Sequence, residues 1–203
     1  MTSFRSIAPA ALVACVVSPA LAGVIVFDDR ASFGAFGLAQ PGTALATETF
    51  DNVSGFAAGG FLGNPNAASE WFANAQDGMI AQNGALRAAN ANRSVTFSFR
   101  SGAVYGIGGD FFYSSANGSF VPGLMMLNLS DGTSYVRNVS SPTTFAGFWS
   151  LGSAISSLTI TPFGTAGGSN FVATDNMAIG FVPSPGAIAL LGLAGMASRR
   201  RRA

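Results

Sequence analysis

The body of the chain is made of short segments in which apolar and polar residues alternate. Residues 94–100 read Ser-Val-Thr-Phe-Ser-Phe-Arg, so Val95, Phe97 and Phe99 share one face of an extended segment. A period of two predicts an antiparallel strand with one buried face. Two similar segments, 127–129 and 135–139, are separated by Asp131-Gly132, which predicts a β-hairpin.

The same reading predicts strands elsewhere in the body and one short helix at 28–36. Gly, Asn and Ser separate the strand segments at short intervals, and this spacing is typical of a β-sandwich or jelly roll. We therefore expect an all-β, antiparallel β-sandwich or jelly-roll domain over residues 23–181. Residues 54–92, rich in Gly, Ala and Asn, give no clear prediction. The further expected strands are 24–27, 46–50, 105–112, 143–149, 155–161 and 171–179.

Composition excludes several kinds of function. The 203 residues include no histidine and one cysteine, so a His-based triad, a Cys–His pair and an ordinary zinc site are excluded. Residues 23–182 hold five arginines and nine acids, a net charge of −4, which argues against a nucleic-acid partner. The chain has 18 phenylalanines, and these bulky side chains can form a core without disulfides.

The N-terminal residues have the three parts of a secretory signal peptide. A short start carrying Arg5 is followed by an apolar run at 7–17, and then by the small residues Ala20 and Ala22. This order predicts a signal peptide over residues 1–22 with cleavage after Ala22. An alternative is that Leu-Val-Ala-Cys at 12–15 is a lipobox and Cys15 carries a lipid. Cleavage after Ala22 would leave an exported chain without cysteine.

The C-terminal residues combine three features in a row. Val182-Pro183-Ser184-Pro185 comes first, and its prolines favour an extended backbone. Residues 186–198 are apolar and predict a transmembrane-type helix of about 20 Å, short for a hydrocarbon core of about 30 Å. The run Arg199, Arg200, Arg201 and Arg202 follows, and arginines in this position favour the cytoplasmic side of a membrane.

This arrangement resembles the PEP-CTERM sorting signal of bacterial exosortase substrates, with Ser184 in the place of the usual Glu. The resemblance covers 182–202 and implies that an exosortase-like enzyme recognises Pro183 and Pro185 and cuts near them. The body would then remain at the cell surface or in the extracellular matrix. An alternative is that the helix is never removed and stays as a membrane anchor. The body also resembles other PEP-CTERM proteins of this size in three short segments, which include Phe27, Arg30 and Phe33, then 49–51, and 175–179.

Two sets of residues in the body are candidate binding sites. Glu48, Asp51 and Asp175 could join the first and last strands through a structural Ca²⁺, which prefers oxygen ligands; otherwise these acids face solvent at strand ends. Trp71 and Trp149 could form an aromatic platform for sugar rings, although core packing is the commoner role of such residues.

The sequence therefore predicts an exported, non-enzymatic protein with a structural or adhesive role. The expected partners are an exosortase-like enzyme and the membrane, and a polysaccharide is a further candidate. A carbohydrate-binding module is the first alternative. A glycan hydrolase is the second, with Glu48 and Glu70 as the only glutamates available for catalysis.

Overall fold

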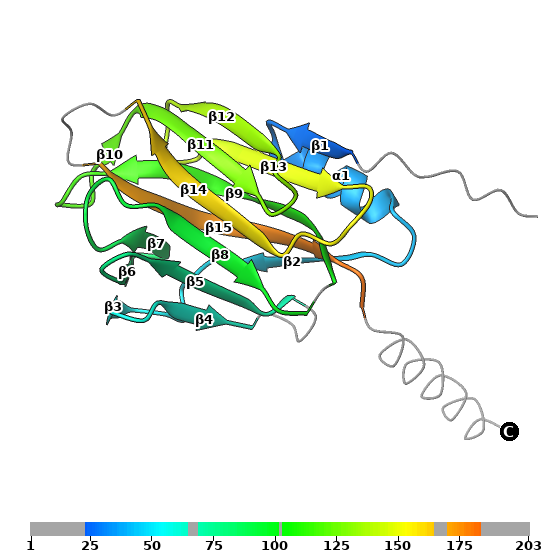
Figure 1. The fold of residues 1–203 in the computed structure, drawn as a ribbon, viewed down its shortest axis with the longest axis horizontal. Coiled ribbons are helices and arrows are strands. Elements are labelled where there is room, and N and C mark those ends of the chain that lie inside the picture. Colours follow the sequence, from blue (N-terminus) through cyan, green and yellow to red (C-terminus); the bar gives the residue numbers. More distant parts are fainter. Residues whose placement is uncertain (1–22, 65–68, 102, 165–169, 184–203) are drawn as a thin grey trace, which may run out of the picture.

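The computed structural model describes residues 23–64, 69–101, 103–164 and 170–183, which form two antiparallel sheets and one helix (Figure 1). In this part of the chain, sheet A has nine strands and sheet B has six. The core of buried side chains lies between the two sheets, so the all-β sandwich prediction is confirmed. No helix within these described ranges is long and apolar enough to cross a membrane.

Sheet A contains the longest strands of the molecule, and β15 runs through its middle, drawn in orange in Figure 1. The path of hydrogen-bonded neighbours is β1-β13-β9-β15-β7-β6-β3, with β10 also paired to β9 and β2 also paired to β15. The strands are β1 (Val24–Phe27), β2 (Ala44–Glu48), β3 (Gly55–Ala57), β6 (Met79–Gln82), β7 (Ala85–Ala88), β9 (Val104–Ser114), β10 (Phe120–Val121), β13 (Phe145–Ser150) and β15 (Phe171–Phe181).

Sheet B follows the path β12-β11-β14-β8-β5-β4. Its β8 is the alternating segment expected from the sequence, and Val95, Phe97 and Phe99 all point into the core. The predicted hairpin at Asp131-Gly132 is also present between β11 and β12. The strands are β4 (Phe61–Gly63), β5 (Trp71–Ala75), β8 (Val95–Phe99), β11 (Gly123–Leu129), β12 (Ser134–Val139) and β14 (Ser157–Phe163).

Helix α1 (Arg30–Ala39) begins directly after its N-cap residue, Asp29. The Asp29 carboxylate accepts the Ser32 backbone N–H at 2.8 Å, which satisfies one free donor of the first turn. This hydrogen bond lowers the pKa of Asp29 below its usual value. The helix starts two residues later and ends three residues later than the predicted range 28–36, because Asp28 and Asp29 precede the helix and Gln40 closes it.

The helix covers one part of the outer face of sheet A and forms a second, smaller core there. Phe33, Phe145 and Trp149 are its buried aromatic members. The Trp149 ring lies directly on two glycines of the sheet: a Cβ at Gly106 would come within 2.3 Å of the ring, and a Cβ at Gly180 within 2.2 Å. Only glycine leaves room for the indole at these two positions.

Candidate functional site

The last strand, β15, changes its neighbour along its length. Its first half pairs with β7 through Ala173 and Thr174, and its second half pairs with β2 from Met177 to Phe181. A β-bulge between Asp175 and Ala178 lies at this change. Asn176 in the bulge has φ +47°, a left-handed conformation that Asn adopts more readily than most residues. The bulge therefore places polar residues at the point where the neighbour of β15 changes from β7 to β2.

Two carboxylates lie opposite each other beside the bulge. Asp110 on β9 is the direct partner of Asp175 on β15. Asp110 is nearly buried and accepts hydrogen bonds from Arg30 Nη2 at 3.0 Å and Asn176 Nδ2 at 3.1 Å. Asp175 Oδ1 accepts the Asn176 backbone N–H at 2.6 Å. Burial, followed by the negative charges of Asp110 and Asp51, raises the pKa of Asp175.

The turn between β6 and β7 reaches the same junction. Asn83 and Gly84 have φ +55° and +76°, as a two-residue type I′ hairpin turn requires. Gly84 lies against Asp51, since a Cβ added there would be 3.0 Å from Asp51 Oδ1. The hairpin formed by β6 and β7 thus makes one wall of an open groove.

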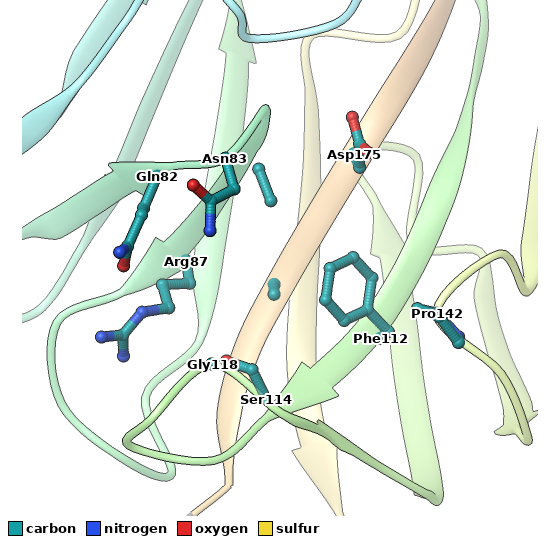
Figure 2. Close-up of a pocket in the computed structure, with 10 residues that line it drawn as sticks. Gln82, Asn83, Arg87, Phe112, Ser114, Gly118, Pro142 and Asp175 are labelled. Atoms are coloured by element: carbon teal, nitrogen blue, oxygen red, sulfur yellow. The ribbon is translucent and has the colours of Figure 1, made fainter.

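This groove lies on the outer face of sheet A, on the part that α1 does not cover, and has a volume of about 240 Å³. Figure 2 shows Arg87 and Asn83 on the β6–β7 side, Phe112 and Ser114 on the β9 side, and Asp175 at one end. The full lining is Gln82, Asn83, Ala85, Arg87, Phe112, Ser114, Gly118, Pro142, Ala173 and Asp175.

Arg87 gives the groove a positive charge. Its guanidinium carbon lies 4.8 Å from the centre of the Phe171 ring, a cation–π contact that holds the side chain in place. The Nη1 atom is buried and has no hydrogen-bond partner. Burial also lowers the pKa of this guanidinium below its usual value.

Ser114 lies at the end of β9 and is only 2% exposed. Its hydroxyl oxygen is likewise buried without a hydrogen-bond partner. A buried donor that stays unpaired costs free energy, about 1–3 kcal/mol. Two such groups line one groove, and this makes the groove the best candidate for a binding site in the described part of the chain.

The three acids considered as calcium ligands are not gathered in one place. Glu48 Oε1 accepts the Phe50 backbone N–H at 3.0 Å, and Glu48 Oε2 accepts the Trp71 ring N–H at 3.2 Å. Asp51 and Asp175 are close enough for the charge of one to act on the other. Among the residues that the structure describes, no three His, Cys, Asp or Glu side chains are arranged to hold a metal ion.

The two tryptophans are buried, with exposures of 0% for Trp71 and 2% for Trp149. Trp71 packs between the sheets against Phe50 and Phe97. Trp149 packs between sheet A and α1, against Phe33 and Phe36. Because neither ring has a face open to solvent, the predicted aromatic platform for sugars is not formed by these residues.

The remaining predicted residues are placed as follows. Glu70 forms an ion pair with Arg100 at 3.7 Å. Val182 donates its backbone N–H to Ala103 O at 2.9 Å, and Pro183 is the last residue described. The predictions for Cys15, Ala20, Ala22, Ser184, Pro185 and Arg199 to Arg202 lie outside the described residues.

The residues that form the groove, above all Arg87, Ser114 and Asn83, were not predicted from the sequence. Two signals were available in the range 54–92: one hairpin-turn dipeptide is Asp77-Gly78, and the second, nearer to Arg87, is Asn83-Gly84. The second would have predicted the hairpin that carries Arg87. Nothing in the sequence could have indicated that Ser114 and Arg87 line the same groove, since the two belong to strands that are separated by β15.

No protein-family model matches the chain, and no curated protein is similar to it. A functional conclusion must therefore come from the residues themselves.

Proposed function

We propose that this chain is an exported protein, sorted by an exosortase-like enzyme through its PEP-CTERM-like tail. Its β-sandwich then has a structural or adhesive role at the cell surface or in the extracellular matrix. The proposal is carried by the order of sequence features at 182–202: a Pro-x-Pro box, an apolar segment and four arginines. The predicted signal peptide at 1–22 agrees with it.

The way the sandwich ends supports the proposal. Strand β15 ends at Phe181, Val182 makes one more backbone hydrogen bond, and Pro183 has no N–H with which to continue a ladder. The Pro-x-Pro box therefore begins where the last strand stops. Cleavage after Pro183 would remove no described strand and no residue of the core.

An adhesive role is supported by the outer face of sheet B. Three large apolar side chains on adjacent strands are 41% to 44% exposed there: Leu124, Val136 and Phe163. Leu124 and Phe163 are direct partners across β11 and β14, and Met126 on the same face lies opposite Val136. Exposed apolar side chains that lie together are typical of interaction surfaces.

A second candidate function is carbohydrate binding. It is favoured by the open groove at Arg87 and Ser114, in place of the buried tryptophans. No catalytic role is proposed, because Glu48 is engaged by Trp71 and Phe50, and Glu70 by Arg100.

The sorting proposal is tested by replacing Pro183 and Pro185 with Ala and measuring the mass and location of the mature protein. We expect the unaltered protein to lose its C-terminal residues, from the cleavage point near Pro183 and Pro185 to Ala203. The double variant should keep these residues and stay in the membrane fraction. Pro142→Ala, at an exposed loop proline, is the matched control and should be processed normally. An unaltered mature protein that still ends at Ala203 would refute the proposal.

A further inference from the structure

We propose that the groove at Arg87 and Ser114 binds one uronic-acid residue of an acidic polysaccharide, with the sugar carboxylate held by these two side chains. This inference deepens the second candidate function, carbohydrate binding, and is independent of how the protein is sorted.

The charge of Arg87 favours an anionic ligand. The structure describes five arginines, and four of them have a carboxylate within ion-pair distance, whereas Arg87 has none. In a region with more acids than arginines, a half-buried arginine without a carboxylate is unusual. Its Nη1 atom is also buried and without a partner. An anion in the groove would neutralise the charge of Arg87 and pair its Nη1 atom, and a carboxylate can accept two parallel hydrogen bonds from the planar guanidinium. The four pairs are Arg30–Asp110, Arg93–Asp77, Arg100–Glu70 and Arg137–Asp28.

The Ser114 hydroxyl favours the same anionic ligand. Its hydroxyl is buried and lines the same groove without a partner. A serine hydroxyl donates one hydrogen bond, so a carboxylate held by Arg87 could accept it. One anion therefore accounts for two otherwise unexplained groups, which are brought together by strands on opposite sides of β15.

The groups that surround these two side chains favour a sugar. The exposed side-chain amides of Gln82 and Asn83 can both donate and accept, as sugar hydroxyls require. Asp175, when ionised, accepts hydrogen bonds from hydroxyls and donates none. Phe112 adds an apolar ring to the same lining. A ligand that uses all of these needs a carboxylate, several hydroxyls and an apolar C–H face, which is the composition of a uronic acid.

The size of the groove limits the ligand. Its volume of about 240 Å³ lies below the range of about 300–1,000 Å³ that holds drug-sized ligands, so one sugar ring fits better than several. Gln82, Asn83 and Pro142 at the rim are exposed. The neighbouring sugars of a polymer could therefore extend into solvent on either side.

The experiment uses the full chain, purified in detergent, and calorimetric titration with D-galacturonate, D-galactose and acetate. Galactose has the same ring without the carboxylate, and acetate has the carboxylate without the ring. We expect galacturonate to bind at least about ten-fold more tightly than either. Arg87→Gln should reduce galacturonate affinity to the level of galactose. Arg93→Gln, which removes an exposed arginine paired only with Asp77, should leave it unchanged.

Ser114→Ala provides a second variant if Arg87→Gln does not fold, because it removes only a hydroxyl that has no partner in the protein. It should weaken galacturonate binding several-fold without lowering the thermal unfolding temperature, because the removed hydroxyl is a buried group that has no partner. Equal affinity for galacturonate and galactose would overturn the uronic-acid assignment while leaving carbohydrate binding in place. Equal affinity for galacturonate and acetate would show a carboxylate site without sugar recognition. No binding of any of the three would refute both the assignment and the second candidate function.

Discussion

The outer face of sheet A has two halves that share strands β9 and β15 but differ in what covers them (Figure 1). One half lies under α1 and is filled by aromatic side chains around Trp149. The other half is open and is lined by Arg87, Ser114 and Asp175. The first half is packed with apolar side chains, whereas in the second half buried polar atoms of Arg87 and Ser114 have no hydrogen-bond partner.

The difference is set by small residues and by one bulge. In the covered half, Gly106 and Gly180 give the Trp149 ring a flat surface, so the helix can approach the sheet. In the open half, the outer positions hold larger side chains, Phe112 on β9 and Arg87 on β7. The bulge at Asp175 divides the two, because it lets Asp175 line the groove while Met177, two residues later, lies in the main core. A single sheet can therefore carry a packed face and a binding face.

The largest effect is expected at the centre of the covered half. Trp149→Ala should lower the free energy of unfolding by about 3–5 kcal/mol, because it leaves a large cavity between α1 and the sheet. The measurement is chemical denaturation followed by Tyr and Trp fluorescence and circular dichroism. Phe56→Ala, at a phenylalanine that is 62% exposed, is the control and should change stability by less than about 0.5 kcal/mol. Similar losses in the two variants would mean that Trp149 is not packed as described.

A smaller effect is expected from filling the space that glycine leaves. Gly106→Ala puts a methyl group within 2.3 Å of the Trp149 ring and should lower the free energy of unfolding by about 1–3 kcal/mol. Gly34→Ala is the matched control, since nothing lies within 4 Å of its added Cβ in the helix. It should be neutral or stabilise by up to about 1 kcal/mol. A Gly106→Ala protein as stable as the unaltered chain would contradict the close approach of helix and sheet.

The smallest effect concerns the open half and depends on pH. Burial and the charges of Asp110 and Asp51 raise the pKa of Asp175, while Arg30 and the Asn176 N–H act in the opposite direction. A carboxyl whose pKa is raised on folding binds more protons in the folded state. Its contribution to stability is therefore fully present below its unfolded pKa and is lost as pH rises through its folded pKa.

Asp175→Asn should accordingly raise the unfolding temperature at pH 7 and have no effect near pH 3. The gain is expected to be below about 1 kcal/mol, because solvent screens this partly exposed group. The check is thermal unfolding of both proteins from pH 3 to pH 7. Asp131→Asn, at an exposed hairpin turn, is the control for exchanging an Asp for an Asn. A gain that is equal at both pH values would exclude the electrostatic explanation.

The parts of the fold that depend on local pattern were predictable. β1 has the bounds expected from the sequence, β8 is shorter by one residue at each end, and the Asp131-Gly132 hairpin is present. Strands β3 to β7 were missed, because their segments are only three to five residues long and their apolar residues are often adjacent, so no alternation with polar residues can be recognised. The helix continues to Ala39, beyond the predicted end at residue 36. Gly37 in this last part packs against Trp149, and a contact between residues so far apart in the sequence cannot be predicted from local pattern.

The candidate site was predictable only in part. Asp175 was recognised from its place before the last apolar strand, and it does lie at the junction of β15 with two neighbours. Asp110 was not recognised, because its importance comes from being paired with Asp175 across the sheet. For Trp71 and Trp149, core packing was the commoner of the two roles considered, and both side chains are buried. Local sequence cannot distinguish a buried ring from an exposed one when both occur in strands of similar composition.

The position of β15 has a mechanical consequence for any tail attached at Pro183. Because β15 is hydrogen-bonded to β9 on one side and to β2 on the other up to Phe181, a force applied along its axis loads both rows of bonds in shear. An edge strand attached in the same way would peel open one bond after another. A tether at this point should let the folded domain withstand tension, as attachment to a moving or growing surface would require.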